Sequence, residues 1–252
     1  MAFSRLPSQA GVYWWLDAKK KVLYVGKAKN LKNRVSSYQA TAELSPRIRE
    51  MVTQAKYLQW RILPSEIEAL LVEAELIRLY QPPFNVLLKD DKSPLYIVIT
   101  KETWPRVLKM RKRDLSKFQL KPGGKMEGRI FGPFISAYKV TEVLKLVRPI
   151  FPWCNAPRKH KMRRCLENHL QLCPGVCTGS ISQEDYQVII DNLSLFLAGK
   201  TQVVQRRLKM QLRAAVQAEA FEKAAVLRDQ LQLIAQITAS GKHLKDEYFL
   251  PN

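Results

Sequence analysis

The chain has 252 residues, with 42 Lys and Arg against 22 Asp and Glu, so its formal net charge is +20. Hydrophobic residues make up 46% of it, enough for a core, which excludes a generally disordered protein. No apolar run approaches the roughly 20 residues of a membrane-spanning helix, and no signal-peptide pattern follows Met1. We therefore expect a cytoplasmic protein without membrane contact. So large an excess of positive charge favours a polyanionic partner, and nucleic acid fits better than a membrane surface.

The first 88 residues predict a small α/β unit. Two short runs, Val12–Leu16 and Val22–Val25, flank a polar turn and predict a strand hairpin that brings Tyr13 and Tyr24 together. From Lys27 onward the sequence predicts a helix that carries cations where a phosphate could be met. The remaining elements are expected in the order helix, helix, strand and helix, over residues 30–37, 45–55, 56–63 and from 65 to the prolines at 82–83.

The last of these helices has its own start signal. Ser65 is a candidate N-cap, and Glu68 three residues later completes the sequence pattern of a capping box. Apolar residues then recur at helical spacing until Pro82 and Pro83, which stop the helix.

The middle of the chain is strand-like and then helical. Beyond a charged turn at 89–92, short apolar runs and a basic, glycine-containing loop predict three strands, at residues 96–99, 106–110 and 129–134. Helices are expected around residues 140–147 and 184–197, and a helix pair with a break near 217–220 fills 200–237. A helix pair this short has too small a core to stand alone, so it should dock on the rest of the chain or on a partner.

All four cysteines lie in one segment, with the spacing Cys154-x10-Cys165-x7-Cys173-x3-Cys177. In a reducing compartment such a group favours a metal site over disulfides. Four thiolates can bind Zn²⁺ or hold an iron–sulfur cluster. Structural zinc usually shows two close cysteine pairs, and only the last two cysteines are close here, which favours iron–sulfur. The alternative is four cysteines without a metal.

Other groups in this segment bear on the same site. His160 and His169 could serve as ligands, although four cysteines already suffice. The cations between the cysteines would present a basic patch to DNA; they are Arg158, Lys159, His160 when charged, Lys161, Arg163 and Arg164.

The hairpin sequence, Gly11-Val12-Tyr13 followed by Tyr24-Val25-Gly26-Lys27, resembles the GIY-YIG nuclease signature in the form found in the UvrC family of bacterial nucleotide excision repair. The resemblance runs from about Leu6 to Ile237. It implies a fold of class α/β (α+β): a GIY-YIG domain with a small mixed sheet, a cysteine-cluster region and an antiparallel helical hairpin. The implied divisions are a nuclease domain at 1–92, a strand-rich linker region with a helix at 93–150, the cysteine region at 151–199, a UVR hairpin at 200–238 and a tail at 239–252.

The resemblance also implies a set of site residues. The catalytic ones would be Tyr13, Tyr24, Lys27, Arg34, Tyr38 and Asn85, and Glu73 would bind one divalent ion, Mg²⁺ or Mn²⁺.

Each side chain has an expected role. A tyrosine would be the general base, and because its pKa is near 10 it needs a nearby cation; Lys27, three residues away, favours Tyr24. Arg34 would clamp a phosphate with its bidentate fork, and Tyr38 would orient the phosphate or the water. By pattern alone, the tyrosines could instead be core aromatics and Glu73 a solvated charge beside an apolar stripe.

Cofactors and partners follow from the same resemblance. Cys154, Cys165, Cys173 and Cys177 would hold a [4Fe–4S] cluster, with Zn²⁺ as the alternative. The hairpin at 200–238 would engage UvrB, and the substrate would be damaged double-stranded DNA, cut on the 3′ side of the lesion. A full-length UvrC continues into an RNase H-like domain and helix-hairpin-helix motifs, so the 5′ incision is expected to be beyond a chain ending at Asn252.

Two other functions stay open at this point. One is a stand-alone, structure-specific GIY-YIG endonuclease that needs no UvrB, which the helical hairpin argues against. The other is a non-catalytic DNA-binding adaptor, which the intact set of candidate catalytic residues argues against.

Overall fold

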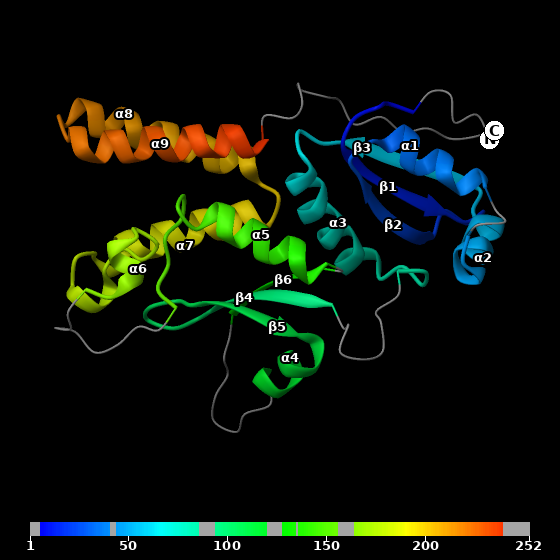
Figure 1. Cartoon of the computed structure of the whole chain (residues 1–252), viewed down its shortest axis with the longest axis horizontal. Helices are drawn as coiled ribbons and strands as arrows, with labels where there is room; N and C mark the ends of the chain where they lie inside the picture. The colour runs from blue at the N-terminus through cyan, green and yellow to red at the C-terminus, as the bar shows by residue number, and fades with distance from the viewer. Residues whose placement is uncertain are drawn as a thin grey trace. The chain divides into compact units, whose positions relative to one another are not determined.

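The computed structural model describes residues 6–40, 44–85, 94–119, 128–134, 136–155 and 164–238. The predicted charged turn at 89–92, the glycine-containing loop, the cations at 158–163 and the C-terminal tail lie outside these ranges. The chain forms two compact units, residues 1–87 with 235–252, and residues 88–234. Figure 1 labels their helices and strands, and each unit is described by itself.

The first unit is built on a three-stranded sheet with the order β2-β1-β3. Strand β1 (Gly11–Leu16) lies in the centre and pairs with β2 (Val22–Ala28) through the predicted hairpin. On its other edge β1 pairs with β3 (Tyr57–Ile62). Asp17 closes the hairpin turn, since its carboxylate accepts from the N–H groups of Lys19 and Lys21 at 2.8 and 2.9 Å.

Both pairings in this sheet are antiparallel, so the expectation of a mixed sheet was wrong. The reason lies in the connection between β2 and β3. Strand β2 ends beside Gly11, and the intervening helices carry the chain back along the sheet, so that β3 begins beside Leu16. Strand β3 therefore runs opposite to its neighbour, β1.

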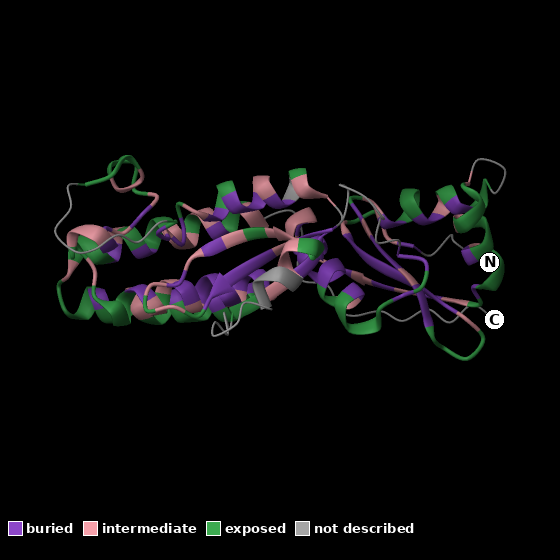
Figure 2. Ribbon diagram, turned by 90° about the horizontal axis from the view of Figure 1, so that it is seen from below, coloured by how far each residue is buried: buried purple, intermediate pink, exposed green. Residues whose placement is uncertain are grey.

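Helices cover both faces of this sheet. One face packs against α1 (Leu31–Ser36), the 3₁₀ turn η2 (Ser37–Gln39) and α2 (Pro46–Gln54), and the other face packs against α3 (Glu66–Tyr80). Because successive side chains of a strand point to opposite faces, the buried side chains form two clusters, one on each face of the sheet. Figure 2 shows the strands mostly in the buried colour.

Helix α3 begins and ends as its sequence predicts. The Ser65 hydroxyl accepts a hydrogen bond of 3.2 Å from the N–H of Glu68, which satisfies one of the helix's first N–H groups. The helix ends at Tyr80, and Gln81 adopts a left-handed conformation with φ of 44° before the two prolines.

The second unit contains another antiparallel sheet, with the order β5-β4-β6. Its strands are β4 (Leu95–Thr100), β5 (Val107–Arg111) and β6 (Gly128–Phe134), in the three predicted regions. The sequence did not predict the helix that follows β5, α4 (Lys112–Gln119). The first turn of α4 is strongly charged, and the sequence therefore predicts this segment as part of the basic loop.

Helices complete the second unit. They are α5 (Ala137–Val147), α6 (Leu166–His169), the 3₁₀ turn η4 (Val176–Thr178), α7 (Gln183–Leu197), α8 (Thr201–Gln217) and α9 (Phe221–Thr238), whose last residues cluster with the first unit. Figure 1 shows α8 and α9 running in opposite directions on either side of a short turn, as predicted for 217–220. No helix in the described part of the chain has the length and apolar character needed to span a bilayer.

Candidate active site

The two hairpin tyrosines lie on the same face of the first sheet. Tyr13 is paired with Gly26 and Trp15 with Tyr24, so strand alternation directs Tyr13 and Tyr24 to one side, with ring centroids 6.3 Å apart. Gly26 makes this possible. A β-carbon at that position would lie 2.5 Å from the Tyr13 hydroxyl and 2.9 Å from the Tyr24 ring, closer than packed atoms approach.

The helix after the hairpin adds two more side chains to this group. Arg34 and Tyr38 are four residues apart, so α1 and the turn η2 direct both toward the hairpin. Arg34 donates from Nε to the Tyr13 hydroxyl at 3.1 Å, and the Tyr13 and Tyr38 hydroxyls share a hydrogen bond of 2.7 Å. The guanidinium also lies over the Tyr38 ring, 5.3 Å from its centroid. Four predicted site residues thus form one cluster, called the tyrosine–arginine cluster below.

The tyrosines of this cluster differ in access to solvent. Tyr13 is fully buried, whereas Tyr24 is partly exposed. Burial raises the pKa of Tyr13 well above its usual value, and the neighbouring Tyr24 and Tyr38 add to this rise against the opposing charge of Arg34. Burial, followed by Tyr38, also raises the pKa of Tyr24. The surrounding protein therefore favours the neutral phenols.

Lys27 does not lie beside the tyrosines. In β2 it is three residues from Tyr24, and side chains an odd number apart in a strand point to opposite faces. Its ammonium group contacts the carboxylate of Glu66, in the first turn of α3, at 3.2 Å. The argument that Lys27 lowers the pKa of Tyr24 was therefore wrong, because it counted residues along the chain and ignored strand alternation.

Glu73 and Asn85 meet the free edge of β2. The carboxylate of Glu73 accepts from the backbone N–H of Lys27 at 3.0 Å. The Asn85 amide bonds both backbone groups of Val25 at 2.7 Å, accepting from its N–H and donating to its carbonyl. Both side chains are 8% exposed, so Glu73 is not the solvated charge that the sequence left open. Asn85 acts here on the backbone of an edge strand, whose polar groups would otherwise be unpaired.

The start of α1 does not provide the phosphate site suggested by the sequence. The N–H groups of Leu31 and Lys32 donate to the carbonyls of Gln9 and Pro7, at 2.9 and 3.1 Å. The Asn30 side chain accepts from the N–H of Asn33 at 3.0 Å. Because the chain itself satisfies these donors, a phosphate would have to be met by side-chain cations.

The chemistry of Glu73 fits a divalent ion. Glu73 is a buried carboxylate close enough to Tyr24 to raise the pKa of that tyrosine, and it supplies the hard oxygen that Mg²⁺ or Mn²⁺ prefers. Mg²⁺ commonly uses only one or two protein carboxylates, with water and substrate phosphates as its other ligands. Within the described ranges, no three or more His, Cys, Asp or Glu side chains form a group that could hold a metal ion.

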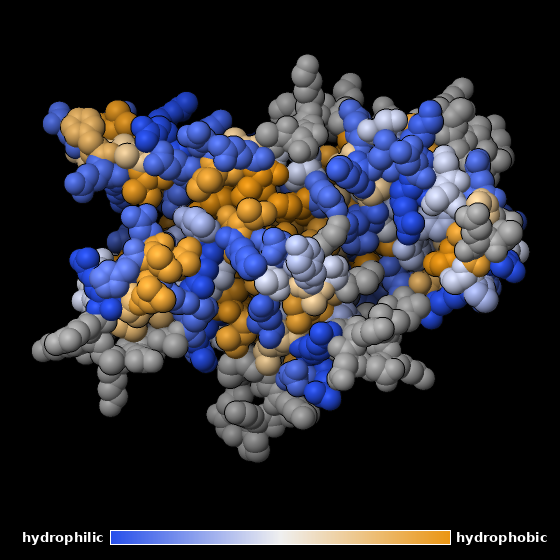
Figure 3. Space-filling model, viewed as in Figure 1, coloured by the Kyte–Doolittle hydropathy of each residue, from blue (hydrophilic) through white to orange (hydrophobic). Residues whose placement is uncertain are grey.

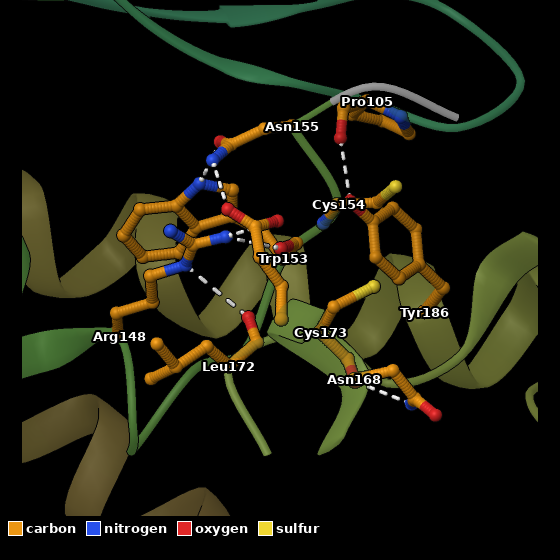
Figure 4. Close-up of polar contacts among 10 residues, drawn as sticks. Pro105, Arg148, Trp153, Cys154, Asn155, Asn168, Leu172, Cys173 and Tyr186 are labelled. Atoms are coloured by element: carbon orange, nitrogen blue, oxygen red, sulfur yellow. Dashed lines mark hydrogen bonds and ion pairs between the residues drawn. The ribbon is translucent and has the colours of Figure 1, made fainter. Parts of the chain in front are cut away.

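In the second unit, two of the four cysteines come together. Cys154 and Cys173 are both buried, and Figure 4 shows their side chains close together beside Tyr186. A hydrogen bond from Cys154 lowers the pKa of Cys173 to about 6; burial opposes this, while the N–H groups of Gly175 and Val176 support it. The hydroxyl of Tyr186 accepts from the N–H of Cys154 at 3.1 Å and donates to the carbonyl of Pro105 at 2.7 Å.

The other two cysteines do not complete a cluster. Cys165 is exposed at the N-terminal end of α6, and Cys177 is partly exposed in η4. His169 ends α6, and His160 lies outside the described ranges. The arrangement of the described residues therefore does not confirm a four-cysteine site.

The sequence interpretation missed two residues of the first unit. Gly26 provides the space that Tyr13 occupies, and Glu66 holds the side chain of Lys27. A signal for Gly26 was present, since glycine inside a strand often marks a close approach. The partner of Lys27 could not be found in this way, because Glu66 is one of several carboxylates on its helix.

Comparison with protein families gives three consecutive matches. Residues 9–86 match the UvrC-like GIY-YIG domain, residues 94–196 the UvrC/Cho excinuclease middle domain, and residues 202–237 the UvrB/uvrC motif. The matches follow the order expected from the sequence.

Curated relatives extend this similarity over nearly the whole chain. "UvrABC system protein C" of Caldanaerobacter subterraneus is 40% identical over 245 residues, which cover 94% of this chain and 38% of that protein. The protein of the same name from Sphingopyxis alaskensis is 40% identical over 240 residues, covering 94% and 36%. The chain thus spans less than two fifths of the length of these relatives.

Among solved structures, the magnesium-bound GIY-YIG N-terminal endonuclease domain of UvrC from Thermotoga maritima is 33% identical to this chain. The match covers 33% of this chain and 91% of that domain, with a TM-score of 0.31.

Proposed function

Because the chain belongs to the UvrC family, we propose that it is a metal-dependent DNA endonuclease of nucleotide excision repair that makes the 3′ incision at a lesion in complex with UvrB. The observation that carries the catalytic part is the tyrosine–arginine cluster, with the buried carboxylate of Glu73 at the edge of the same sheet. Phosphodiester hydrolysis needs a base for the water and positive charge on the phosphoryl oxygens.

Arg34 supplies the positive charge. Its Nε–H holds the Tyr13 hydroxyl, and the guanidinium carries four further N–H donors in a fork that matches two phosphate oxygens. Tyr13 and Tyr38 fix the direction of this fork, one through its hydroxyl and the other through its ring face. In this proposal Tyr13 positions the arginine and does not itself meet the water.

Tyr24 takes the proton of the attacking water. It is the tyrosine of the hairpin that solvent reaches, whereas Tyr13 is fully buried. Since the protein raises the pKa of Tyr24, its phenolate needs added positive charge. A divalent ion would supply that charge and would also offset negative charge on the phosphate. Glu73 would hold that ion, and Asn85 keeps β2 in place beside it.

Partner binding is proposed for the helical hairpin. The sequence at 202–237 matches the UvrB/uvrC motif, and the chain's relatives are named as parts of the UvrABC system. Apolar side chains remain exposed on α8 and α9, at Met210, Val216, Phe221 and Val226. Figure 3 shows apolar side chains among charged ones on this hairpin. Exposed apolar groups of this kind suit a helix-packing partner, and we assign them to UvrB.

The cysteines are proposed to hold a [4Fe–4S] cluster, with Zn²⁺ as the alternative. Two observations support this proposal: two buried thiols lie close together, and the pKa of Cys173 near 6 favours the thiolate that binds metals at neutral pH. Anaerobically purified protein should be coloured and should contain iron and sulfide. Colourless protein with one zinc per chain would establish the alternative.

Mapping of nicks on a lesion-containing duplex tests the main proposal. With UvrB and Mg²⁺, the chain should cut on the 3′ side of the lesion. Equal cutting without UvrB would support a stand-alone nuclease instead. DNA binding without any Mg²⁺-dependent cut would support a DNA-binding adaptor.

A further inference from the structure

The side chain of Arg148, one residue after α5, joins the backbone segments that carry the two buried cysteines. It donates from Nε to the carbonyl of Leu172 at 3.2 Å and from Nη2 to the carbonyl of Trp153 at 3.3 Å. Each of these carbonyls belongs to the residue directly before a cysteine, Cys173 and Cys154. The guanidinium also lies over the Trp153 ring, 5.0 Å from its centroid. Figure 4 shows the arginine between the two segments.

Glu167 extends these contacts toward a third cysteine. Its carboxylate contacts Nη2 of Arg148 at 2.8 Å and accepts from the Asn155 amide at 2.9 Å. Its backbone carbonyl accepts from the N–H of Cys173 at 3.1 Å. Glu167 lies two residues after Cys165, at the start of α6. The Arg148–Glu167 pair therefore contacts the neighbourhoods of Cys154, Cys165 and Cys173.

The geometry needs an arginine. Within the described residues, the cysteine segments follow no strand pairing and α6 has four residues, so no regular hydrogen-bond ladder there fixes the spacing of the cysteines. A planar guanidinium offers donors in several fixed directions, whereas a lysine ammonium is a compact charge on a flexible stem. The Arg148 side chain is 16% exposed, so its bonds to the two carbonyls are largely shielded from water.

From these contacts we infer that Arg148, held by Glu167, is a positioning residue of the cysteine site and sets the separation of Cys154 and Cys173 before any metal binds. The inference deepens the proposed cysteine-held cofactor and rests on it only for the choice of metal. No step of the proposed DNA cleavage uses this arginine, which contacts backbone carbonyls and a carboxylate.

Arg148→Lys tests the inference in the full chain, with Arg129→Lys as the matched control. Arg129 also bonds a carboxylate, that of Asp191 at 2.6 Å, but it contacts no cysteine segment among the described residues. In metal-free protein, alkylation of Cys154 and Cys173 should accelerate about tenfold in Arg148→Lys, the factor that corresponds to one or two lost hydrogen bonds. Alkylation of the exposed Cys165 should proceed at the same rate in wild type and in both variants.

A second readout follows metal retention. After anaerobic reconstitution with iron and sulfide, Arg148→Lys should lose its visible absorption to a chelator about tenfold faster than wild type, as expected for loss of an outer-shell partner. Arg129→Lys should behave as wild type.

The outcomes separate the two proposals. Wild type that takes up neither iron nor zinc removes the cofactor proposal, while the alkylation rates still test Arg148. Wild-type alkylation rates in Arg148→Lys, or the same acceleration in both variants, would overturn the positioning role.

Discussion

The tyrosine–arginine cluster and the cysteine site are assembled in different ways. In the first, Tyr13 and Tyr24 stand on paired strands, and Arg34 with Tyr38 stands on one short helical segment, so regular backbone hydrogen bonds set each position. In the second, Cys154 and Cys173 stand on irregular segments that are held together by the side chains of Arg148, Glu167 and Tyr186.

This difference determines how much of each site is organised without its metal. The tyrosine–arginine cluster has its hydrogen bonds in place among protein atoms alone. The cysteine site brings together only two thiols among the described residues. Regular elements hold side chains more firmly than loops do, so the first site should keep its arrangement without metal. In the second site only Cys154 and Cys173 should keep theirs, and Cys165 and Cys177 should join them when a metal binds.

Loss of the carboxylate at Glu73 should have the largest effect on cleavage. Glu73→Gln keeps the acceptor for the Lys27 N–H but loses the charge, so Mg²⁺-dependent nicking should fall about a thousandfold while DNA affinity changes little. Single-turnover nicking and a binding titration measure the two quantities.

Glu75→Gln, at an exposed carboxylate of the same helix, is the control and should keep the wild-type rate. A wild-type rate in Glu73→Gln would remove this carboxylate from the site. The iron content of Glu73→Gln should equal that of wild type, since the two sites are built from different elements.

Tyr24→Phe should lower the nicking rate about a hundredfold, the usual contribution of a general base. Because its raised pKa keeps Tyr24 mostly neutral at pH 7, the phenolate fraction still increases as the pH rises. The wild-type nicking rate should therefore rise from pH 7 to pH 9. The variant should lose this rise. Equal pH profiles in wild type and Tyr24→Phe would contradict the assignment of Tyr24 as base.

Gly26→Ala should destabilise the chain by about 2 kcal/mol, as overpacking of a core does. The added methyl group meets the Tyr13 hydroxyl and the Tyr24 ring, so the tyrosines or the strand must move and the nicking rate should fall as well. Chemical denaturation measures the stability. Lys29→Ala, at an exposed position just after β2, is the control. An unchanged unfolding free energy in Gly26→Ala would show that the Tyr13 side chain does not pack against residue 26.

The smallest expected effect concerns alkaline stability. Burial raises the pKa of Tyr13 in the folded state, so the neutral phenol stabilises folding fully below pH 10, and this contribution is lost as pH rises toward the folded pKa. Between pH 10 and pH 11, wild type should lose about 1 kcal/mol more unfolding free energy than Tyr13→Phe.

Lysine titration affects both proteins equally and cancels in this comparison. Tyr80→Phe, at an exposed tyrosine, should follow wild type. Parallel curves for wild type and Tyr13→Phe would indicate that Tyr13 reaches solvent.

Much of the first unit could be predicted from the sequence. Strand alternation and the short polar turn predicted the hairpin, and the spacing of Arg34 and Tyr38 is local to one helical segment. Ser65 capped its helix as expected, because capping depends on neighbours within one turn. These features need only the chemistry of nearby residues. The catalytic roles of the site residues and the domain boundaries remain predictions.

Only the tertiary structure decided the contacts between distant segments. The pairing of Lys27 with Glu66 and the bonds of Asn85 to Val25 depend on how α3 and the segment after it meet the sheet edge. The same holds for the bond from Arg148 to the carbonyl before Cys173, across 24 residues. Periodicity identifies which face of an element is buried, but it does not identify the partner, since many polar residues compete for each contact and the packed fold selects one.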